Sequence, residues 1–301
     1  MRVMRIGTRG SQLALRQTAI VAEALRAAAP DIQIEVIVIK TEGDRRLDVS
    51  LEEVGGQGVF VKDIEQALLQ GEINAAVHSL KDMPAITPEG LTIGAVLERG
   101  DVRDALVSRG GLTLRQLPAG ARVGTDSRRR SVQVLAVRPD LRLESIRGNV
   151  DTRVRKAESG EYDAVVLAAA GLERLGLLER AAEVFEVDIV LPAVGQAVLA
   201  VECRAADAGT IALLQRIEHA PTRMAITAER AYLRALGAGC RLPVGALGEA
   251  RGGVLRLQGV LGTEDGRLLR AEVTGPEAEA EALGAGLAAR LMAEAGVSAA
   301  R

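Results

Sequence analysis

One of the two cysteines of this chain lies in a segment typical of an open loop, LGAGCRLPVG, at positions 236–245. Glycine and alanine precede Cys240, Arg241 follows it, and a proline turn closes the segment. A neighbouring cation lowers the pKa of a thiol and favours the nucleophilic thiolate. Because no histidine lies close to Cys240 in the sequence, a hydrolase-type Cys–His pair lacks local support. We therefore expect Cys240 to be an attachment point.

A second chemical feature is the placement of arginines. Of 38 Lys and Arg residues only four are lysines, and arginine binds carboxylates or phosphates through two parallel hydrogen bonds. A compositional bias of the genome explains the count as well as a function does, so the placement must decide. Arginines recur in loops where strands are expected to run into helices, and they are Arg9, Arg128, Arg129, Arg130, Arg147, Arg153 and Arg174.

These loops are suited to bind an anion. Helix N-termini bind anions through free backbone N–H groups, and Ser11, Thr125 and Ser127 add hydroxyl donors. Three adjacent arginines at a helix start oppose the helix dipole, a cost that a bound anion offsets. A single such arginine is more often a solvated surface residue, but their recurrence predicts a ligand with several negative groups. Since GTRGS and GGQG match neither a Walker loop nor a dinucleotide fingerprint, phosphates and polycarboxylates both stay open.

A lone carboxylate is the third feature. In AVHSLKDMP (76–84) a short buried strand runs into Lys81 and Asp82 and is stopped by Pro84. A surface cap is the ordinary explanation for such an aspartate. At a strand's carboxyl end among many arginines, however, Asp82 could stabilise a developing cation or move protons. Lys81 beside it could hold another anion.

The composition narrows the class of protein. Nearly half of the 301 residues are apolar and a quarter are charged, as in a globular protein of two or three domains. Aromatic side chains are almost absent, so stacking platforms for nucleic acid are missing. No apolar run approaches the ~20 residues of a membrane span, and the N-terminus lacks a signal peptide's apolar core. We expect a cytoplasmic protein that binds neither nucleic acid nor membrane.

The remaining cysteine and the histidines suggest no metal site. Cys203 lies in the apolar segment AVLAVEC and is predicted to be a core thiol. Neither cysteine has a partner at metal-ligand spacing, and His78 and His219 are isolated in the sequence. We therefore expect no metal.

The elements that must position these residues form an alternating α/β pattern. Strand-like segments at 3–7, 32–39 and 75–79 alternate with helix-like segments, the first with Ser11 as its candidate cap. This order predicts parallel-type sheets with helices on both faces. Polar residues 98–104 are predicted to connect two such units, with a return crossing near 191–196. The predicted domains are 1–98 with 198–218 (discontinuous, α/β), 99–197 (α/β) and 219–301 (α+β, carrying Cys240).

Nine segments, taken together, resemble the porphobilinogen deaminase family, also called hydroxymethylbilane synthases, of tetrapyrrole biosynthesis. They span roughly residues 5–245 and follow one another in the family's order. The segments are RIGTRGSQLALRQ, GGQGVFVKDIEQALL, AVHSLKDMP, ERGDVRDALVS, VGTDSRRRS, IRGNVDTR, DAVVLAAAGLERLG, LPAVGQAVLAVECR and ERAYLRALGAGCRLPVGA.

This resemblance implies an architecture and an activity. It implies two lobes like a type II periplasmic binding protein, a small C-terminal α+β domain and a monomer. It also implies a covalent dipyrromethane cofactor, made from two porphobilinogen units and joined to Cys240 by a thioether. The enzyme would deaminate four porphobilinogen molecules, condense them onto this primer, and release linear hydroxymethylbilane by hydrolysis. A binding module for a polyanionic small molecule is the alternative.

The resemblance also assigns residues to roles. Asp82 would be the catalytic carboxylate. Cofactor-binding positions would be Cys240, Lys81, Thr125, Ser127, Arg129, Arg130, Arg147, Gly148 and Asp44. Substrate-binding positions would be Arg9, Ser11, Arg147, Arg153, Arg174, Phe60 and Gln196. The chain departs from the family pattern at Glu53 and Gln57, where many relatives carry lysines, and at Arg128, where an apolar residue is common.

Overall fold

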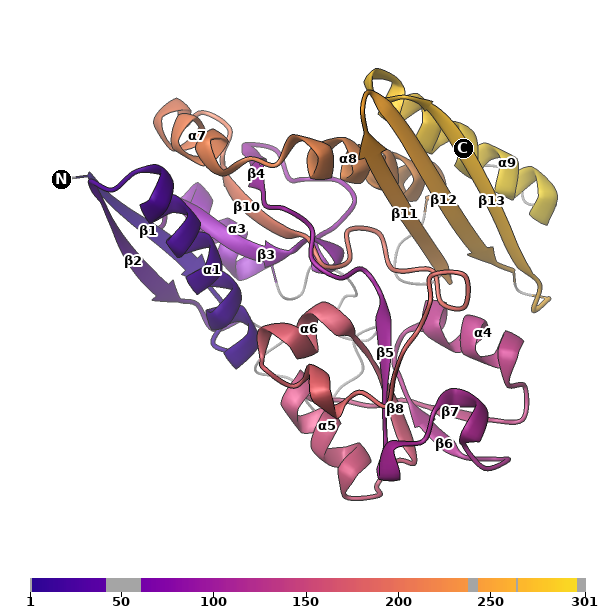
Figure 1. Cartoon of the computed structure of the whole chain (residues 1–301). Coiled ribbons are helices and arrows are strands. Elements are labelled where there is room, and N and C mark those ends of the chain that lie inside the picture. The colour runs from indigo at the N-terminus through magenta and orange to yellow at the C-terminus, as the bar shows by residue number, and fades with distance from the viewer. Residues whose placement is uncertain (1, 42–60, 238–242, 264, 297–301) are drawn as a thin grey trace. The chain divides into compact units, whose positions relative to one another are not determined.

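The computed structural model describes residues 2–41, 61–237, 243–263 and 265–296 (Figure 1). The chain divides into two compact units. Unit 1 comprises Met1–Gly100 and Ala197–Arg223, and unit 2 comprises Asp101–Gln196 and Met224–Arg301. The chain therefore leaves unit 1 after Gly100, returns after Gln196, and leaves it again after Arg223. The three predicted domains, with their boundaries, stay a prediction.

Unit 1 contains a five-stranded sheet in the order β2-β1-β3-β10-β4. The strands are β1 (Arg2–Thr8), β2 (Ile32–Val38), β3 (Ala75–Ser79), β4 (Leu91–Val96) and β10 (Leu199–Arg204). β1 pairs in parallel with β2 and β3, whereas β10 is antiparallel to both β3 and β4. The expectation of a parallel sheet is thus wrong for β10. This strand arrives directly after the return crossing, so no βαβ connection dictates its direction.

Helices cover both faces of this sheet. They are α1 (Gln12–Ala28), α3 (Lys62–Leu69) and α7 (Ala208–Leu214), with short 3₁₀ turns η1 (Leu80–Asp82) and η5 (Gln215–Ile217). The helix α8 (Ala220–Ala235) begins in unit 1 and continues into unit 2. Ser11 caps α1 as predicted, because its side chain accepts a hydrogen bond from Ala14 N. Successive strand side chains alternate between the faces. Val77 and Val201 pack with α1 and α7, while Ala76 packs with α3 on the opposite face.

Unit 2 contains a second five-stranded sheet in the order β7-β6-β8-β5-β9. Its strands are β5 (Asp104–Ser108), β6 (Arg122–Gly124), β7 (Arg142–Glu144), β8 (Ala164–Ala168) and β9 (Glu183–Val184). β6 is parallel to β7 and β8, and β5 is antiparallel to β8 and β9. The two sheets therefore share one topology. In each, the antiparallel strand between two neighbours is the first strand after a crossing.

The helices of this lobe also lie on both faces of its sheet. They are α4 (Arg128–Val137), α5 (Val150–Glu158) and α6 (Ala169–Arg174), with 3₁₀ turns η2 (Arg109–Gly111), η3 (Leu114–Gln116) and η4 (Leu178–Arg180). Leu106 of β5 packs with Val134 of α4, and Val107 packs with Val154 of α5. Alternation along β5 therefore turns Asp104, like Leu106, toward α4.

The C-terminal part of unit 2 is a small α+β structure. β11 (Val244–Arg251), β12 (Val254–Gly262) and β13 (Leu268–Pro276) form an antiparallel sheet, followed by η6 (Glu277–Glu279) and α9 (Ala280–Ala295), which covers one face (Figure 1). Gly284 lets α9 approach α8, since a Cβ there would collide with the Ala228 carbonyl oxygen. Two α/β lobes and a small α+β region confirm the predicted fold class.

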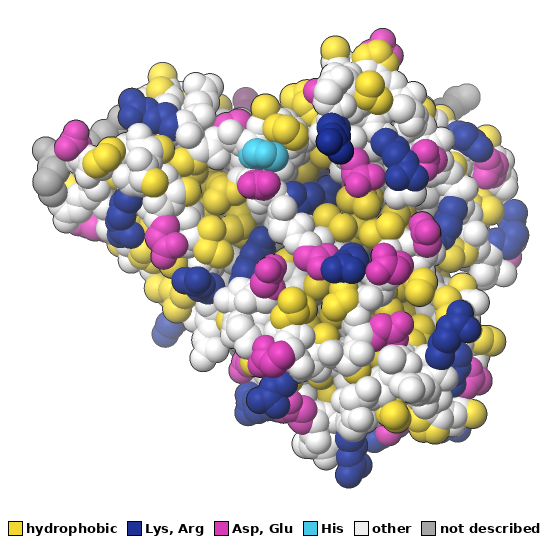
Figure 2. All heavy atoms as spheres, in the orientation of Figure 1, with side chains coloured by type: hydrophobic (Ala, Val, Ile, Leu, Met, Phe, Trp, Pro, Cys, Tyr) yellow, Lys and Arg dark blue, Asp and Glu magenta, His cyan; other side chains and the backbone are white. Residues whose placement is uncertain are grey.

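Charged side chains of both signs are interspersed on the face that Figure 2 shows. Exposed ion pairs such as Arg256–Glu272 and Arg180–Glu158 contribute to the charge pattern of the surface. Such pairs are worth about 0–1 kcal/mol each, so they decide little about the fold. Within the described ranges, no helix has the length and apolar character needed to cross a membrane. The same ranges hold no group of three or more potential metal ligands suited to an ion.

Candidate functional site

Asp82 lies in the turn η1, directly after the buried strand β3. The turn is anchored from both sides: Leu80 N donates to the Val198 carbonyl oxygen at 3.0 Å, and the side chains of Leu80 and Met83 are buried. Asp82 itself is exposed and Lys81 is half-buried. A rigid strand end thus presents a carboxylate to solvent, which is how a group for acid–base work is held in place.

Arg9 and Ser11 lie at the same edge of the unit 1 sheet as Asp82. They follow β1, which is the parallel neighbour of β3, and the carboxyl ends of parallel strands meet at one edge, the usual ligand-binding edge of such sheets. Arg9 is half-buried. The structure therefore gathers Arg9, Ser11, Lys81 and Asp82 at one edge of one sheet.

Behind this edge, unit 1 buries an acidic cluster. His78 Nε2 of β3 lies 3.1 Å from Glu202 Oε2 of β10, and both side chains are buried. Burial raises the pKa of Glu65 on α3; the Glu202 carboxylate raises this pKa further, while His78 and Lys62 oppose the shift. Within the described part of the chain, Glu65 Oε1 and Glu202 Oε1 accept no hydrogen bond. This cluster, which we call the His78 cluster, consists of His78, Glu65 and Glu202.

Unit 2 places its predicted site residues around the N-terminus of α4. Ser127 caps the helix by accepting from Arg130 N at 3.4 Å, and Thr125 Oγ1 accepts from Ser127 N at 3.2 Å. Thr125 is buried, and its own N–H donates to the Glu144 carbonyl oxygen beside it. Arg128 is exposed. The loop after β6 is therefore fixed before any ligand arrives.

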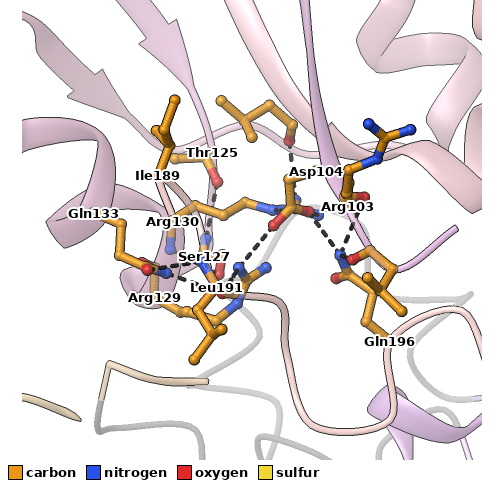
Figure 3. Close-up of polar contacts among 12 residues, drawn as sticks. Arg103, Asp104, Thr125, Ser127, Arg129, Arg130, Gln133, Ile189, Leu191 and Gln196 are labelled. Atoms are coloured by element: carbon orange, nitrogen blue, oxygen red, sulfur yellow. Dashed lines mark hydrogen bonds and ion pairs between the residues drawn. The ribbon is translucent and has the colours of Figure 1, made fainter. Parts of the chain in front are cut away.

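Arg129 and Arg130 turn inward from α4 and converge on Asp104 (Figure 3). Arg129 Nη1 donates to Asp104 Oδ2 at 2.7 Å, while Arg130 Nη2 and Nε donate to Asp104 Oδ1 at 2.7 and 3.0 Å. The side chains of Arg129, Arg130 and Asp104 are 6%, 8% and 0% exposed. We call these three residues the Asp104 cluster. The anion that sequence reasoning required beside the adjacent arginines is present here as a side chain of the chain itself.

The charges of the Asp104 cluster are strongly coupled. Burial alone would raise the pKa of Asp104, but the guanidiniums of Arg129 and Arg130 outweigh burial and hold this pKa well below its ordinary range. Burial also lowers the pKa of Arg129, an effect that the Asp104 carboxylate opposes. Two guanidiniums against one carboxylate leave one surplus positive charge in a nearly dry environment. That surplus favours a further carboxylate at this place.

Gln196 is a core residue of unit 2. It is 0% exposed, and its Nε2 donates to the Val102 carbonyl oxygen at 2.7 Å and to Asp104 Oδ1 at 3.1 Å. Asp104 was expected in the polar connector 98–104, but it is the first residue of β5 and fully buried. The polar pattern of residues 98–104 gave the wrong prediction for Asp104, because arginines distant in the sequence neutralise its charge and allow it to be buried.

The other arginines follow the remaining parallel strands of unit 2. Arg147 and Gly148 lie after β7 at the start of α5, where Gly148 has a φ of 114°, a conformation that favours glycine. Arg153 Nε donates to the Gly148 carbonyl oxygen at 2.8 Å. Arg174 ends α6, after β8, and burial lowers its pKa. Thr125, Arg147 and Arg174 thus lie beyond the carboxyl ends of three adjacent strands.

Three predicted site residues, Asp44, Phe60 and Cys240, lie outside the described residues, as do Glu53 and Gln57. The chain just after Cys240 is described, and it packs on α4. Ala246 N donates to the Pro192 carbonyl oxygen at 3.1 Å, and a Cβ on Gly245 would lie 2.6 Å from that oxygen and 3.0 Å from Arg129 Cδ. Only glycine permits this approach.

Cys203 is buried in β10, which confirms the predicted core thiol, and burial raises its pKa to about 11. Sequence reasoning missed Asp104, Glu65 and Glu202. A signal existed for one contact, because His78 and Glu202 are polar residues inside otherwise apolar strands, and buried polar groups need partners. The sequence did not reveal that they pair with each other.

Known proteins of one family match this chain over nearly its whole length. The family model "Porphobilinogen deaminase, dipyromethane cofactor binding domain" matches residues 4–212, and "Porphobilinogen deaminase, C-terminal domain" matches residues 223–293. The porphobilinogen deaminase of Desulforudis audaxviator is 52% identical over 288 residues, covering 95% of this chain and 93% of that protein. That of Pelobacter propionicus is 49% identical over 296 residues, covering 98% and 95%.

Two solved structures match at low sequence identity. A methionine binding protein has a TM-score of 0.44 at 12% identity, covering 71% of this chain and 89% of its own. A YaeC-family lipoprotein from Enterococcus faecalis has a TM-score of 0.42 at 14% identity, covering 72% and 91%.

Proposed function

Because the chain belongs to the porphobilinogen deaminase family and is a hydroxymethylbilane synthase with a dipyrromethane cofactor, we propose that Asp82 is its catalytic carboxylate and that Cys240 holds the cofactor through a thioether. The observation that carries the function is the match of two family models to residues 4–212 and 223–293. A binding module without catalysis has no observation in its favour.

The residues at the sheet edge of unit 2 fit a ligand that carries carboxylates. The Asp104 cluster keeps one surplus positive charge, and hydroxyls of Thr125 and Ser127 lie in the same turn. Each pyrrole ring of this family's substrate and cofactor bears an acetate and a propionate. When bound, the cofactor supplies the primer onto which four porphobilinogen units are condensed before hydrolysis releases linear hydroxymethylbilane. Guanidiniums and helix N–H groups are the donors that carboxylates prefer.

Asp82 suits the charge that this chemistry creates. Loss of ammonia from porphobilinogen leaves positive charge on the pyrrole, and an exposed carboxylate fixed at a strand end stabilises that charge and assists the proton transfers. Arg9, Ser11 and Lys81 at the same edge would hold acidic side chains of the substrate. We retain the other assignments from the family resemblance: cofactor contacts from Arg129, Arg130, Arg147, Gly148 and Asp44, and substrate contacts from Arg153, Arg174 and Phe60. Gln196 was also predicted to bind substrate, but its side chain is 0% exposed, so we propose that it acts through Asp104 instead.

We extend the proposal to the whole protein as a cytoplasmic monomer of three domains, 1–98 with 198–218, 99–197 and 219–301. The shared topology of the two five-stranded sheets supports two lobes of one kind. The separate antiparallel sheet β11-β12-β13 with α9 supports a third domain.

The thioether is tested by intact mass. Wild-type protein should exceed its sequence mass by one thioether-linked dipyrrole, and Cys240→Ala should be a folded apoprotein at its sequence mass without turnover. Cys203→Ala is the matched control, since that thiol is buried in the core and should not affect the added mass. Added mass or turnover in Cys240→Ala would refute the attachment.

The role of Asp82 is tested by Asp82→Asn. We expect this variant to carry the cofactor but to condense porphobilinogen about a hundredfold more slowly or worse, the usual loss when an acid–base group is removed. Glu89→Gln removes an exposed carboxylate from the same unit and should retain the wild-type rate. A near-normal rate in Asp82→Asn would remove the assigned role.

A further inference from the structure

Asp104 occupies an unusual position for a buried carboxylate. It opens β5, only four residues after the chain has left unit 1 at Gly100. The strand's alternation turns it toward α4, and its side chain is 0% exposed. A carboxylate in such a place is tolerated only where donors surround it.

Four donors surround it. Arg129 donates once, Arg130 donates twice, and Gln196 Nε2 donates at 3.1 Å (Figure 3). The backbone fixes the arginines further: Arg129 Nη1 donates to the Leu191 carbonyl oxygen at 2.7 Å and Arg130 Nη1 to the Val166 carbonyl oxygen at 2.9 Å. Both guanidinium planes are therefore oriented from within the protein.

Without Asp104, the two arginines would be adjacent buried cations with no counter-charge in the Asp104 cluster. Two like charges held together in a dry environment repel one another, and each would turn toward water. With Asp104, the pair is held close with one surplus positive charge. A ligand carboxylate then meets donors whose orientation is already set, which lowers the cost of binding.

Asp104 also links the two arginines to the two segments at which the chain crosses between the units, one just after Gly100 and the other ending at Gln196. Gln196 is the last residue before the return crossing, and it also donates to the Val102 carbonyl oxygen in the outgoing segment. Leu191 of the return segment is fixed by Arg129 and by Gln133, whose Nε2 donates to its carbonyl oxygen at 3.0 Å. Asp104 accepts hydrogen bonds from both Arg129 and Gln196, so it links the contacts of the two segments.

We propose that Asp104 is a positioning residue for the cofactor: it holds Arg129 and Arg130 in the orientation that receives a cofactor carboxylate, and through Gln196 it links them to both crossing segments. The proposal rests on the proposed assignment of Arg129 and Arg130 to cofactor binding. Asp104 acts through the arginines and touches neither cofactor nor substrate.

The test measures cofactor assembly rather than turnover alone. Wild type, Asp104→Asn and a control are produced as full-length apoproteins without porphobilinogen. Each is then given porphobilinogen at a temperature below the melting point of every variant, and the fraction with added mass is followed over time. Asn keeps the shape of Asp104 but removes its charge. We expect Asp104→Asn to gain the cofactor mass about tenfold more slowly or worse, the size of effect that supporting residues have at metal sites.

The control is Asp207→Asn. Asp207 caps α7 and pairs with Arg204 at 3.1 Å, so its loss also removes a carboxylate–arginine contact, but in unit 1. Because β10 runs antiparallel to β3, this contact lies at the opposite end of the unit 1 sheet from Asp82. A merely structural role for Asp104 predicts that both variants melt earlier and gain cofactor at the wild-type rate. That outcome would overturn the proposal.

A second variant covers the case in which Asp104→Asn does not fold. Gln196→Met removes the donor to Asp104 and Val102 but leaves all three charges, and we expect slower cofactor uptake than wild type. Uptake at the wild-type rate by Gln196→Met would refute the link to the crossing segments. Failure of the proposed thioether is distinguishable, because wild type itself would then gain no mass.

Discussion

Each unit buries a cluster of charged side chains close to its predicted site residues, and these two clusters have opposite composition. The Asp104 cluster of unit 2 has two cations and one carboxylate, and every carboxylate oxygen accepts hydrogen bonds. The His78 cluster of unit 1 has two carboxylates and one imidazole, and one oxygen of each carboxylate accepts none from the described residues. Charge balance, rather than burial, separates them.

The pKa shifts follow this difference. Arg129 and Arg130 overcome burial and lower the pKa of Asp104, whereas burial and Glu202 together raise the pKa of Glu65. Asp104 therefore keeps its charge to a lower pH than an ordinary aspartate does. Glu65 instead keeps its proton to a higher pH than an ordinary glutamate does. The two clusters thus respond to pH in opposite directions.

The largest expected effect is on the Asp104 cluster. Asp104→Ala leaves two buried guanidiniums without their counter-charge, and breaking a buried pair in this way costs about 3–5 kcal/mol of the free energy of unfolding. Urea unfolding measures this loss. A loss as small as that of an exposed pair, such as Glu158→Ala beside Arg180, would show that the two clusters do not differ as described.

His78→Leu should have an intermediate effect. It removes the donor to Glu202 Oε2, so a buried carboxylate is left without a hydrogen bond from its neighbour. We expect a loss of about 1–3 kcal/mol in urea unfolding, the cost of an unsatisfied buried acceptor. His219→Leu is the control for loss of an imidazole, since His219 Nδ1 contacts Thr222 Oγ1 and accepts from Thr222 N at the start of α8. A larger loss for His78→Leu than for Asp104→Ala would reverse the comparison.

How well the sequence predicts a feature depends on how far apart in the chain the interacting residues lie. Ser11 as a cap, AAVHS as a buried strand and Cys203 as a core thiol depend on local pattern, and the structure confirms all three. Asp104 lies 25 and 26 positions from its arginines, and His78 lies 124 positions from Glu202.

The topology of the two sheets was likewise not predictable from local sequence pattern. Pattern alone shows that a buried polar residue needs a partner, but not which residue crosses the sheet to meet it. The antiparallel direction of β5 and β10 was equally beyond local pattern, since it results from where the chain crosses between units.

The smallest expected effect is the most specific to the His78 cluster. Because the folded pKa of Glu65 is raised above its ordinary value of 4.5, the folded state holds this proton to higher pH than the unfolded chain does. Its contribution to stability therefore falls as pH rises from that value through the folded pKa, and then levels off. Asp104 has the opposite sign: its contribution is lost as pH falls.

Glu65→Gln removes this titration. The unfolding free energy of Glu65→Gln minus that of wild type should rise across this pH window and stay constant above it, because burial and then the Glu202 carboxylate disfavour the ionised form of Glu65 in the folded state. Urea unfolding at a series of pH values measures the difference. Glu202→Gln keeps an acceptor for His78 but removes one cause of the raised pKa, so Glu65→Gln made in that background should show a smaller rise. An unchanged rise would mean that burial alone, without the second carboxylate, sets the pKa of Glu65, and the contrast between the clusters would then be one of solvation rather than of charge balance.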